Sequence, residues 1–576
     1  MLVHLLVIGS VFLPIASSVP TPPTAAQARQ RPLRGYNPCN GLNCVMSQIG
    51  EVALKDLAYS ISTNGMLKAN YSWFNLDDGV MASRDANGDL VANTAGFPSG
   101  SLLPLANYVN NLGLSLGAYT DRGYTTCEGL PGSKGHEFQD AATFVKWGVR
   151  YLKSDSCSSS PDFYNATLDY KLMASGLNST GEDVFFSLCG WFSGFASFSE
   201  ISLADTWRIA TDVPNFDRFM QNIESASAAS TFTGPGKGWP DVDMIGGKWS
   251  SDQETLHVCF IAIIGAPLLL SWNISNPIDS TLPLASYLNP ELLSIHSDDA
   301  SLSVKARGYY YKRISGGAVT GSPTVEVSSP SLPIATDIPC DSTRANWIWT
   351  PNNYSSSWGT LESQSMQGYC LGIWDTWIGT CIDPLAAQLV PCENNKDGCD
   401  IDARTWSVDS SSRLLVNASW GGNTPRSGPF LTQIGGVPSA LFVQALSSTT
   451  PPPLIKEQQI WKTSISPTSP SGTVTTIQGS GETCLGVSIE GATSTNVWAR
   501  WLENGDIALL LFNVGSTSAT VTCDAACFAQ IEGTTAQWTA RNVWTREQEG
   551  VIISANGYST TLPRDGGTKF LRLTPQ

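Results

Sequence analysis

Histidine is scarce in this chain, with four among 576 residues, and the four form no cluster with the spacing of metal ligands. We therefore expect no metal and no other cofactor. Cations are in the minority, with 33 Lys and Arg against 49 Asp and Glu, and the net charge of −16 argues against nucleic acid as a partner. A glycine-rich phosphate loop is missing, and no run after the first eighteen residues is apolar and long enough to span a membrane.

The beginning of the chain, Met1 to Ser18, is apolar and reaches small residues at its end. This pattern is typical of a secretory signal peptide, although positive charge at its start is weak; the alternative is a buried first helix. Fourteen cysteines in that setting predict disulfides, and spacing alone suggests the local pairs Cys39–Cys44 and Cys523–Cys527. Six glycosylation sequons fit a secreted, extracellular protein: Asn70, Asn165, Asn178, Asn273, Asn353 and Asn417.

Short apolar segments with the character of strands recur along the first half of the chain. They span 71–78, 114–121, 151–157, 184–189, 207–212, 242–245 and 267–272. Helical patterns lie between them, one from Gln139 to Trp147 and one opening at Ser251, where Glu254 suggests a capping box. This alternation over roughly 250 residues, with polar groups at the strand ends, predicts an α/β fold of the (β/α)₈ barrel type. The alternative is an open doubly wound sheet, which the missing phosphate loop disfavours.

Two of these segments bring a carboxylate to a strand end shortly after a cation. Lys153 precedes Asp155 in YLKSDSC, and Arg208 precedes Asp212 in WRIATD. Paired carboxylates are the groups with which glycoside hydrolases cleave sugars. Lys153 shares a strand face with Asp155, so its charge would favour the ionised carboxylate. The alternatives are a salt bridge at the rim for this pair and a solvated strand end for Asp212.

The order of the motifs resembles glycoside hydrolase family 27, the α-galactosidase and α-N-acetylgalactosaminidase family. The matching segments are NLDDG (75–79), FPSG (97–100), LGAYTDRG (116–123), TCEGLPGSKGHE (126–137), WGVRYLKSDSC (147–157), SLCGW (187–191), WRIATD (207–212) and GWPDVDM (238–244). The resemblance covers about residues 35 to 310 and resumes near 495 to 576. It implies a (β/α)₈ barrel over 35–305, followed by a C-terminal antiparallel β domain over 491–576.

The same resemblance implies a retaining mechanism in which Asp155 is the nucleophile and Asp212 is the general acid and base. The implied substrate-binding residues are Asp77, Asp78, Tyr119, Cys127, Lys153, Cys189, Trp191 and Arg208. Asp77 and Asp78 would accept hydrogen bonds from the hydroxyls at carbons 4 and 6, and the axial hydroxyl at carbon 4 distinguishes galactose from glucose. The alternative for these two acids is a helix cap or a solvated turn. Cys127 with Cys157 matches a family disulfide beside the nucleophile.

Departures from the family pattern leave the substrate open. The segment 35–40 (GYNPCN) stands where the family has a tryptophan-bearing strand, so one aromatic wall is altered. Gly79 and Val80 replace a cysteine and a tryptophan, and Gly190 replaces a glutamate that many members carry near carbon 2. The expected activity is that of a secreted α-galactosidase acting on galactose-containing oligosaccharides or polysaccharides. An α-N-acetylgalactosaminidase, a β-L-arabinopyranosidase and an inactive carbohydrate-binding protein remain alternatives, and the oligomeric state is left open.

A stretch rich in Ser, Thr, Pro and Gly separates the barrel from the C-terminal domain and reads as an insertion over 338–490. It contains two Cys-Leu pairs, at Cys370 and Cys484, which follow Trp349 and Trp461 at similar distances. This repeat resembles a ricin-type β-trefoil, a three-lobed module that often binds carbohydrate. The alternative is a glycosylated and partly disordered insertion.

Overall fold

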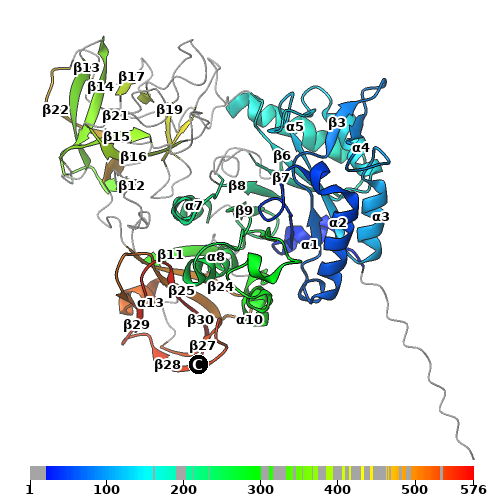
Figure 1. Ribbon diagram of the computed structural model, residues 1–576. Helices are drawn as coiled ribbons and strands as arrows, with labels where there is room; N and C mark the ends of the chain where they lie inside the picture. The colour runs from blue at the N-terminus through cyan, green and yellow to red at the C-terminus, as the bar shows by residue number, and fades with distance from the viewer. Residues whose placement is uncertain are drawn as a thin grey trace, which may run out of the picture.

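The computed structural model divides into a barrel, a β-rich segment and a C-terminal antiparallel β domain (Figure 1). The described residues are 21–159, 163–189, 203–209, 212–230, 233–299, 310–315, 332–341, 345–352, 355–365, 367–373, 385–392, 405–408, 414–416, 430–433, 441–444, 462–463, 465, 469–478, 483–487, 494–531 and 536–576. The expected signal peptide, Met1 to Ser18, lies outside them. Across these ranges, every helix is too short or too polar to traverse a bilayer.

Eight parallel strands form the barrel, in the order β10-β1-β2-β5-β6-β7-β8-β9. They are β1 (Arg34–Tyr36), β2 (Trp73–Asn75), β5 (Ser115–Asp121), β6 (Tyr151–Asp155), β7 (Phe185–Leu188), β8 (Thr206–Arg208), β9 (Trp239–Asp241) and β10 (Leu268–Leu270). A parallel bridge between Ile245 and Leu270 links the chain after β9 to β10 and closes the ring. The predicted (β/α)₈ barrel is therefore confirmed, and the open sheet is excluded.

Helices surround the barrel (Figure 1). They are α2 (Met46–Thr63), α3 (Leu103–Asn111), α4 (Glu137–Lys146), α5 (Phe163–Ser179), α7 (Phe216–Ala229), α8 (Ser251–Ile264), α9 (Leu284–Tyr287) and α10 (Pro290–His296), with a hairpin of β3 (Met81–Arg84) and β4 (Leu90–Ala92) after β2. Helix α1 (Ala25–Gln30) lies at the amino end of β9, where the Trp239 indole donates to the carbonyl of Ala28 at 2.8 Å. Helix α1 thus helps to cover the floor of the barrel.

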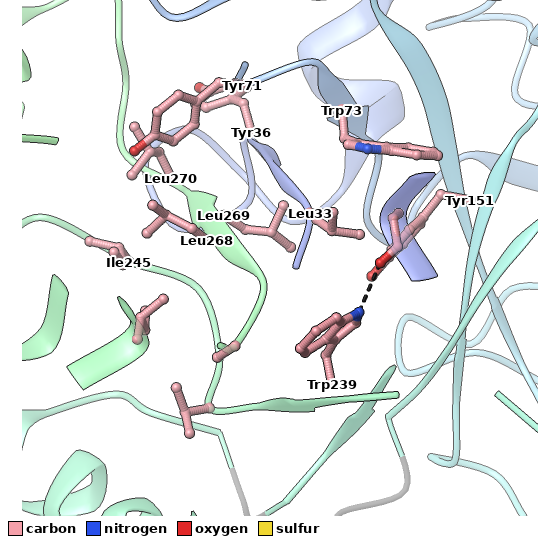
Figure 2. Packing of buried hydrophobic residues seen from close by; sticks show 14 of the residues in the cluster. Leu33, Tyr36, Tyr71, Trp73, Tyr151, Trp239, Ile245, Leu268, Leu269 and Leu270 are labelled. Atoms are coloured by element: carbon pink, nitrogen blue, oxygen red, sulfur yellow. Dashed lines mark hydrogen bonds between the residues drawn. The ribbon is translucent and has the colours of Figure 1, made fainter. Parts of the chain in front are cut away.

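Aromatic side chains fill that floor. The rings of Tyr151 and Phe185 stack with centroids 5.7 Å apart, and Trp73 lies 6.2 Å from Tyr151. Figure 2 shows Trp73, Tyr151 and Trp239 around the same interior space. Because side chains alternate along a strand, Tyr151, Lys153 and Asp155 of β6 share one face. They lead from the apolar floor to the polar carboxyl end, where barrel enzymes carry their active sites.

Two local predictions were wrong. The segment 242–245 was expected to be a strand, but the strand is β9, and 242–245 contributes only the bridge at Ile245. Asp243 has a φ of 81°, a left-handed conformation that interrupts an extended chain. The capping box of α8 is formed by Ser250 and Gln253 rather than by Ser251 and Glu254.

The C-terminal domain begins before the insertion. Its six-stranded sheet contains β11 (Tyr311–Ser315), β24 (Thr495–Trp501), β25 (Ile507–Asn513), β30 (Gly567–Pro575), β27 (Gln537–Asn542) and β28 (Gln548–Ile553); β26 (Ala519–Cys523), β29 (Tyr558–Leu562) and α13 (Ala525–Ile531) complete the domain. Strand β11 pairs antiparallel with β24, so the chain leaves this sheet at Ser315 and returns to it at Thr495. Buried Arg500 docks the domain onto the barrel by donating to the Ala262 carbonyl of α8 at 2.7 Å.

The segment between these two strands is an antiparallel β structure. Its strands are β12 (Leu332–Pro339), β13 (Asn346–Asn352), β14 (Ser355–Ser363), β15 (Tyr369–Ile373), β16 (Leu385–Pro391), β17 (Thr405–Val408), β18 (Leu414–Val416), β19 (Phe430–Gln433), β20 (Leu441–Gln444), β21 (Lys462–Thr463), β22 (Thr473–Gln478) and β23 (Thr483–Val487). Strands β12 and β23 pair with each other, and the disulfide Cys340–Cys484 joins the same region, so the two ends of the segment lie side by side.

Each Cys-Leu pair of this segment meets one buried tryptophan. The indole of Trp347 donates to the Leu485 carbonyl at 3.0 Å, and the indole of Trp406 donates to the Leu371 carbonyl at 2.6 Å. The same contact of an indole with a leucine carbonyl thus occurs twice. The tryptophans that make it, Trp347 and Trp406, are not Trp349 and Trp461, which the sequence spacing indicated. Trp349 makes neither contact, and Trp461 lies outside the described residues.

Candidate active site

A pocket opens among the strands at the carboxyl end of the barrel. It is lined by Asn37, Leu76, Tyr151, Lys153, Ser187, Cys189, Arg208, Asp241, Asp243, Met244 and Leu269. These residues lie on or just after seven of the eight barrel strands, all but β5, and their polar groups converge on a single space. Convergent polar groups in a recess of this kind suit a small polar ligand such as one sugar unit.

Asp155 ends β6 beside this pocket. Its carboxylate accepts hydrogen bonds from the Tyr119 hydroxyl at 2.9 Å and from the Ser156 backbone N–H at 2.9 Å. A disulfide between Cys127 and Cys157 ties the loop after β5 to the loop after β6, and the Cys127 sulfur lies 3.7 Å from the carboxylate. The two donors fix the orientation of the carboxylate.

A second buried acid, Asp121, stands directly across from Asp155 in the β5–β6 register. It accepts from the backbone N–H groups of Gly123 at 2.6 Å and Cys157 at 2.7 Å. Burial and the nearby charge of Asp155 raise the pKa of Asp121 to about 7. Sequence reasoning gave Asp121 no role, although its place at the end of a strand was the available signal. The structure makes it a support for the loop that carries Cys157.

Asp77 and Asp78 lie just after β2, and both are buried. Lys153 forms its ion pair with Asp77, at 3.2 Å, rather than with Asp155 on its own strand. Burial disfavours the ammonium of Lys153, but Asp77, Cys189 and Asp155 together outweigh burial and hold the pKa of Lys153 well above its ordinary value. Asp78 accepts from the backbone N–H groups of Gly79 at 2.6 Å and Glu128 at 3.0 Å. The two acids are therefore neither a solvated turn nor exposed caps.

Asp212 lies on the other side of the barrel mouth from Asp77 and forms an ion pair with Arg208. The guanidinium is 3.1 Å from the Asp212 carboxylate and 3.0 Å from that of Asp243. Half of the Asp212 side-chain surface is exposed. Desolvation by the surrounding protein nevertheless raises the pKa of Asp212, against the opposing charge of Arg208. Asp243 also accepts from the Val213 N–H at 2.8 Å, which fixes the chain immediately after Asp212.

Three other expected binding residues, Tyr119, Cys127 and Cys189, lie within the described residues, and one does not. Cys189 is a buried free thiol at the end of β7, 3.7 Å from the Arg208 guanidinium, and burial raises its pKa well above the ordinary value. The hydroxyl of Tyr119 lies 3.1 Å from the Cys127 sulfur. Trp191 lies outside the described residues. Asn37 lines the pocket but was missed, because it belongs to none of the acid-and-cation pairs.

The remaining predicted modification sites are a disulfide of the C-terminal domain and the glycosylation sequons. Cys523 and Cys527 form a disulfide between β26 and α13 of the C-terminal domain. The sequon asparagines Asn70 and Asn178 are exposed. Asn273 is half-buried, and Asn165 lies in α5. The other two sequons, at 353 and 417, lie outside the described residues.

A closed (β/α)₈ barrel with two carboxylates at its mouth, followed by an antiparallel β domain, is an arrangement typical of a glycoside hydrolase. A family model described as alpha galactosidase A matches residues 39–289, and one described as alpha galactosidase C-terminal beta sandwich domain matches residues 492–573. The chain belongs to this α-galactosidase family, glycoside hydrolase family 27.

Sequence relatives align with about half of this chain. It is 34% identical to the alpha-galactosidase of Cyamopsis tetragonoloba over 282 residues, which are 48% of this chain and 66% of that protein. It is 30% identical to alpha-galactosidase A of Cellvibrio japonicus over 286 residues, 47% of this chain and 69% of that protein. For alpha-galactosidase 2 of Arabidopsis thaliana the identity is 32% over 281 residues, 48% and 68% of the two chains. The chain thus spans about two thirds of the length of these relatives.

Solved structures share the fold. The crystal structure of alpha-galactosidase I from Mortierella vinacea superposes with a TM-score of 0.56 at 17% identity, covering 95% of this chain and 98% of that chain. The structure of a family 27 β-L-arabinopyranosidase from Geobacillus stearothermophilus gives 0.54 at 12% identity, covering 96% and 98%. At such identities the likeness concerns the fold, and it extends to proteins with different named substrates.

Proposed function

We propose that this protein is a secreted, retaining exo-α-galactosidase. The observation that carries the proposal is the unequal environment of two carboxylates at one barrel mouth. Asp155 accepts two hydrogen bonds that orient its carboxylate, as a nucleophile requires, whereas the raised pKa of Asp212 favours the protonated form that a general acid requires. In the first step Asp155 attacks the anomeric carbon while Asp212 protonates the leaving oxygen. In the second step Asp212 takes a proton from the water that releases the sugar.

The preference for galactose rests on Asp77 and Asp78. Both carboxylates are buried and held by protein donors, so they present fixed acceptors to hydroxyls at carbons 4 and 6. A buried acceptor left without its hydroxyl costs binding energy, which disfavours sugars of other configuration. The named relatives are α-galactosidases, and a structure of the Saccharomyces cerevisiae enzyme with raffinose shares the fold. Galactose-containing oligosaccharides are therefore the proposed substrates.

The first prediction concerns the choice of sugar. The protein is expected to release nitrophenol faster from nitrophenyl α-galactoside than from the α-N-acetylgalactosaminide or the β-L-arabinopyranoside, measured in parallel as kcat/KM. A preference for either of the other two sugars contradicts the galactose assignment. Release from none of the three, with retained binding of galactose, favours a carbohydrate-binding protein without turnover.

We further propose that the chain is divided into a catalytic barrel over 35–305, an inserted β-trefoil over 338–490 that binds carbohydrate, and a C-terminal domain over 491–576, to which β11 adds a strand from before the insertion. The twelve-stranded antiparallel segment, its adjoining ends and the repeated contact of tryptophan with leucine carbonyl support a compact module. Each of these contacts lies within the module, so the barrel does not depend on them.

The second prediction is the effect of deleting residues 338–490. The deletion is expected to weaken retention of the protein on galactose-containing polysaccharide while kcat/KM for nitrophenyl α-galactoside stays close to that of the full chain. Affinity electrophoresis in polysaccharide gels measures the retention, and the assay on the small substrate is the internal control. Unchanged retention after deletion contradicts a binding role for the segment.

A further inference from the structure

The loop between β1 and α2 stands at the edge of the pocket and is closed by the disulfide Cys39–Cys44. It occupies the place where the family resemblance leads one to expect an aromatic wall. Cys39 is buried, and Asn37 at the start of the loop lines the pocket with 3% of its surface exposed. The loop therefore contributes a buried amide to the site instead of an indole.

Both the nitrogen and the oxygen of the Asn37 side-chain amide form hydrogen bonds. Its Nδ2 donates to the Asp77 carboxylate at 2.8 Å, and its Oδ1 accepts from the Cys39 backbone N–H at 3.0 Å. The Asp77 oxygen that accepts a hydrogen bond from Asn37 also accepts one from the Lys153 ammonium, at 3.2 Å. One side chain thus connects the disulfide loop to the acid that is proposed to bind sugar hydroxyls.

The loop and the acidic turn are joined at two further points. The backbone N–H of Met46 donates to the Asp78 carbonyl at 2.9 Å, and that of Ser47 donates to the Gly79 carbonyl at 3.1 Å. Gly79 has a φ of 82°, and a Cβ there would lie 2.6 Å from Val45 Cα. Glycine is required by both facts. Three consecutive residues of the turn, 77 to 79, are therefore held by the chain that follows β1.

The far side of the loop is anchored to the chain after β10. The N–H of Asn40 donates to the Ser271 hydroxyl at 3.0 Å. Gly41 lies so close to the Trp272 backbone that no side chain would fit between them. The disulfide then limits the conformations open to the segment between these anchors, as a covalent cross-link does. The position of the Asn37 amide is thus determined from both sides.

We infer that Asn37, held by the Cys39–Cys44 loop, is a positioning residue that orients the Asp77 carboxylate toward the sugar. The inference rests on the proposed function, because Asp77 is taken as the acceptor of galactose hydroxyls. The Asn37 amide directs Asp77 through a hydrogen bond to a charged acceptor, which is stronger than a bond between neutral groups. Asn37 itself need not touch the substrate.

The test is Asn37→Asp. This change keeps the size of the side chain and the oxygen that accepts from Cys39, but it places a carboxylate against Asp77 in place of a donor. We expect kcat/KM for nitrophenyl α-galactoside to fall by about 10- to 100-fold, mainly through KM. Relative to the wild type, activity should recover as pH falls, because the introduced carboxyl donates to Asp77 once it is protonated. Asn37→Ala should show no such recovery.

The same loop offers a matched control, Asn43→Asp. Asn43 Oδ1 accepts from the Val45 N–H at 2.9 Å, and its Nδ2 donates to Gln48 at 2.8 Å. The side chain of Asn43 caps its turn in the same way as that of Asn37, but its amide N–H donates to Gln48 and not to Asp77. This control should keep the kinetics and pH profile of the wild type. Wild-type kinetics in Asn37→Asp, or an equal loss in Asn43→Asp, overturns the inference.

Removing the disulfide gives a second measurement. Cys39→Ser with Cys44→Ser should raise KM, whereas Cys523→Ser with Cys527→Ser, which opens a loop of similar size in the C-terminal domain, should leave KM unchanged. Thermal unfolding of every variant verifies that it is folded. Galactose affinity by calorimetry separates the two proposals. If the wild type hydrolyses none of the glycosides, the proposed function fails, while a weaker galactose Kd in Asn37→Asp still supports the inference.

Discussion

Asp155→Asn is expected to abolish turnover while leaving the fold intact. An amide is a much weaker nucleophile than a carboxylate, so the glycosyl-enzyme cannot form in the normal way. Asparagine can preserve the local contacts: its oxygen accepts from the Ser156 N–H, and its amide group faces the Tyr119 hydroxyl, which can accept. The loss of kcat on nitrophenyl α-galactoside, with an unchanged unfolding temperature, is the measurement.

Chemical trapping identifies the nucleophile independently of the substitution. A fluorosugar that forms a slowly hydrolysed intermediate should label the wild type on the peptide that contains Asp155, and mass spectrometry locates the label. Asp121 is the informative neighbour, because it stands across from Asp155 on the adjacent strand and is also buried. A label on Asp121, or on any other carboxylate, contradicts the assignment.

Asp212→Ala should lower kcat by about 10²- to 10⁴-fold for substrates with poor leaving groups, which depend on protonation. Substrates with good leaving groups should be affected much less in the first step. Azide should partly restore the variant, because it attacks the intermediate without help from a base, and the glycosyl azide should have the retained configuration. Leaving-group dependence and product analysis are the measurements.

The same variant should change the dependence on pH. A general acid works in its protonated form, so activity of the wild type is lost as pH rises through the raised pKa of Asp212. Asp212→Ala has no such proton to lose, and its activity should be insensitive to pH in that range. An inverted first-formed sugar by proton NMR, or an equal loss with every leaving group, argues against Asp212 as the acid and base.

Much of the barrel could be predicted because its signals are local. An apolar segment that ends in Asp155 is visible as a strand without knowledge of its neighbours, and several such segments in order define the fold. The two wrong predictions, the strand over 242–245 and the capping box of α8, depend on local details that an apolar pattern does not show. The φ of 81° at Asp243 ends the extended chain, and neighbouring serines at 250 and 251 compete for one cap.

Contacts across the barrel could not be predicted in the same way. Period-two alternation associates Lys153 with Asp155, yet the ammonium reaches Asp77, which follows the end of a different strand. The bond from Asn37 to Asp77 likewise joins the loops after β1 and β2, whose pairing in the sheet is not visible in the spacing of the sequence. Sequence spacing shows which face a side chain shares, but the partner across a barrel depends on the curvature and stagger of the strands.

The pairing of β11 with β24 has a consequence for synthesis on the ribosome. Strand β11 emerges at Ser315, but its partner in the sheet begins at Thr495, so the intervening segment is translated first. At ordinary elongation rates this is a delay of roughly 10–40 s. During that time β11 has a free edge, and the barrel's α8 lacks the sheet that later covers it. The inserted chain, whose ends adjoin through β12 and β23, has the opportunity to complete its own structure before the surrounding domain can close.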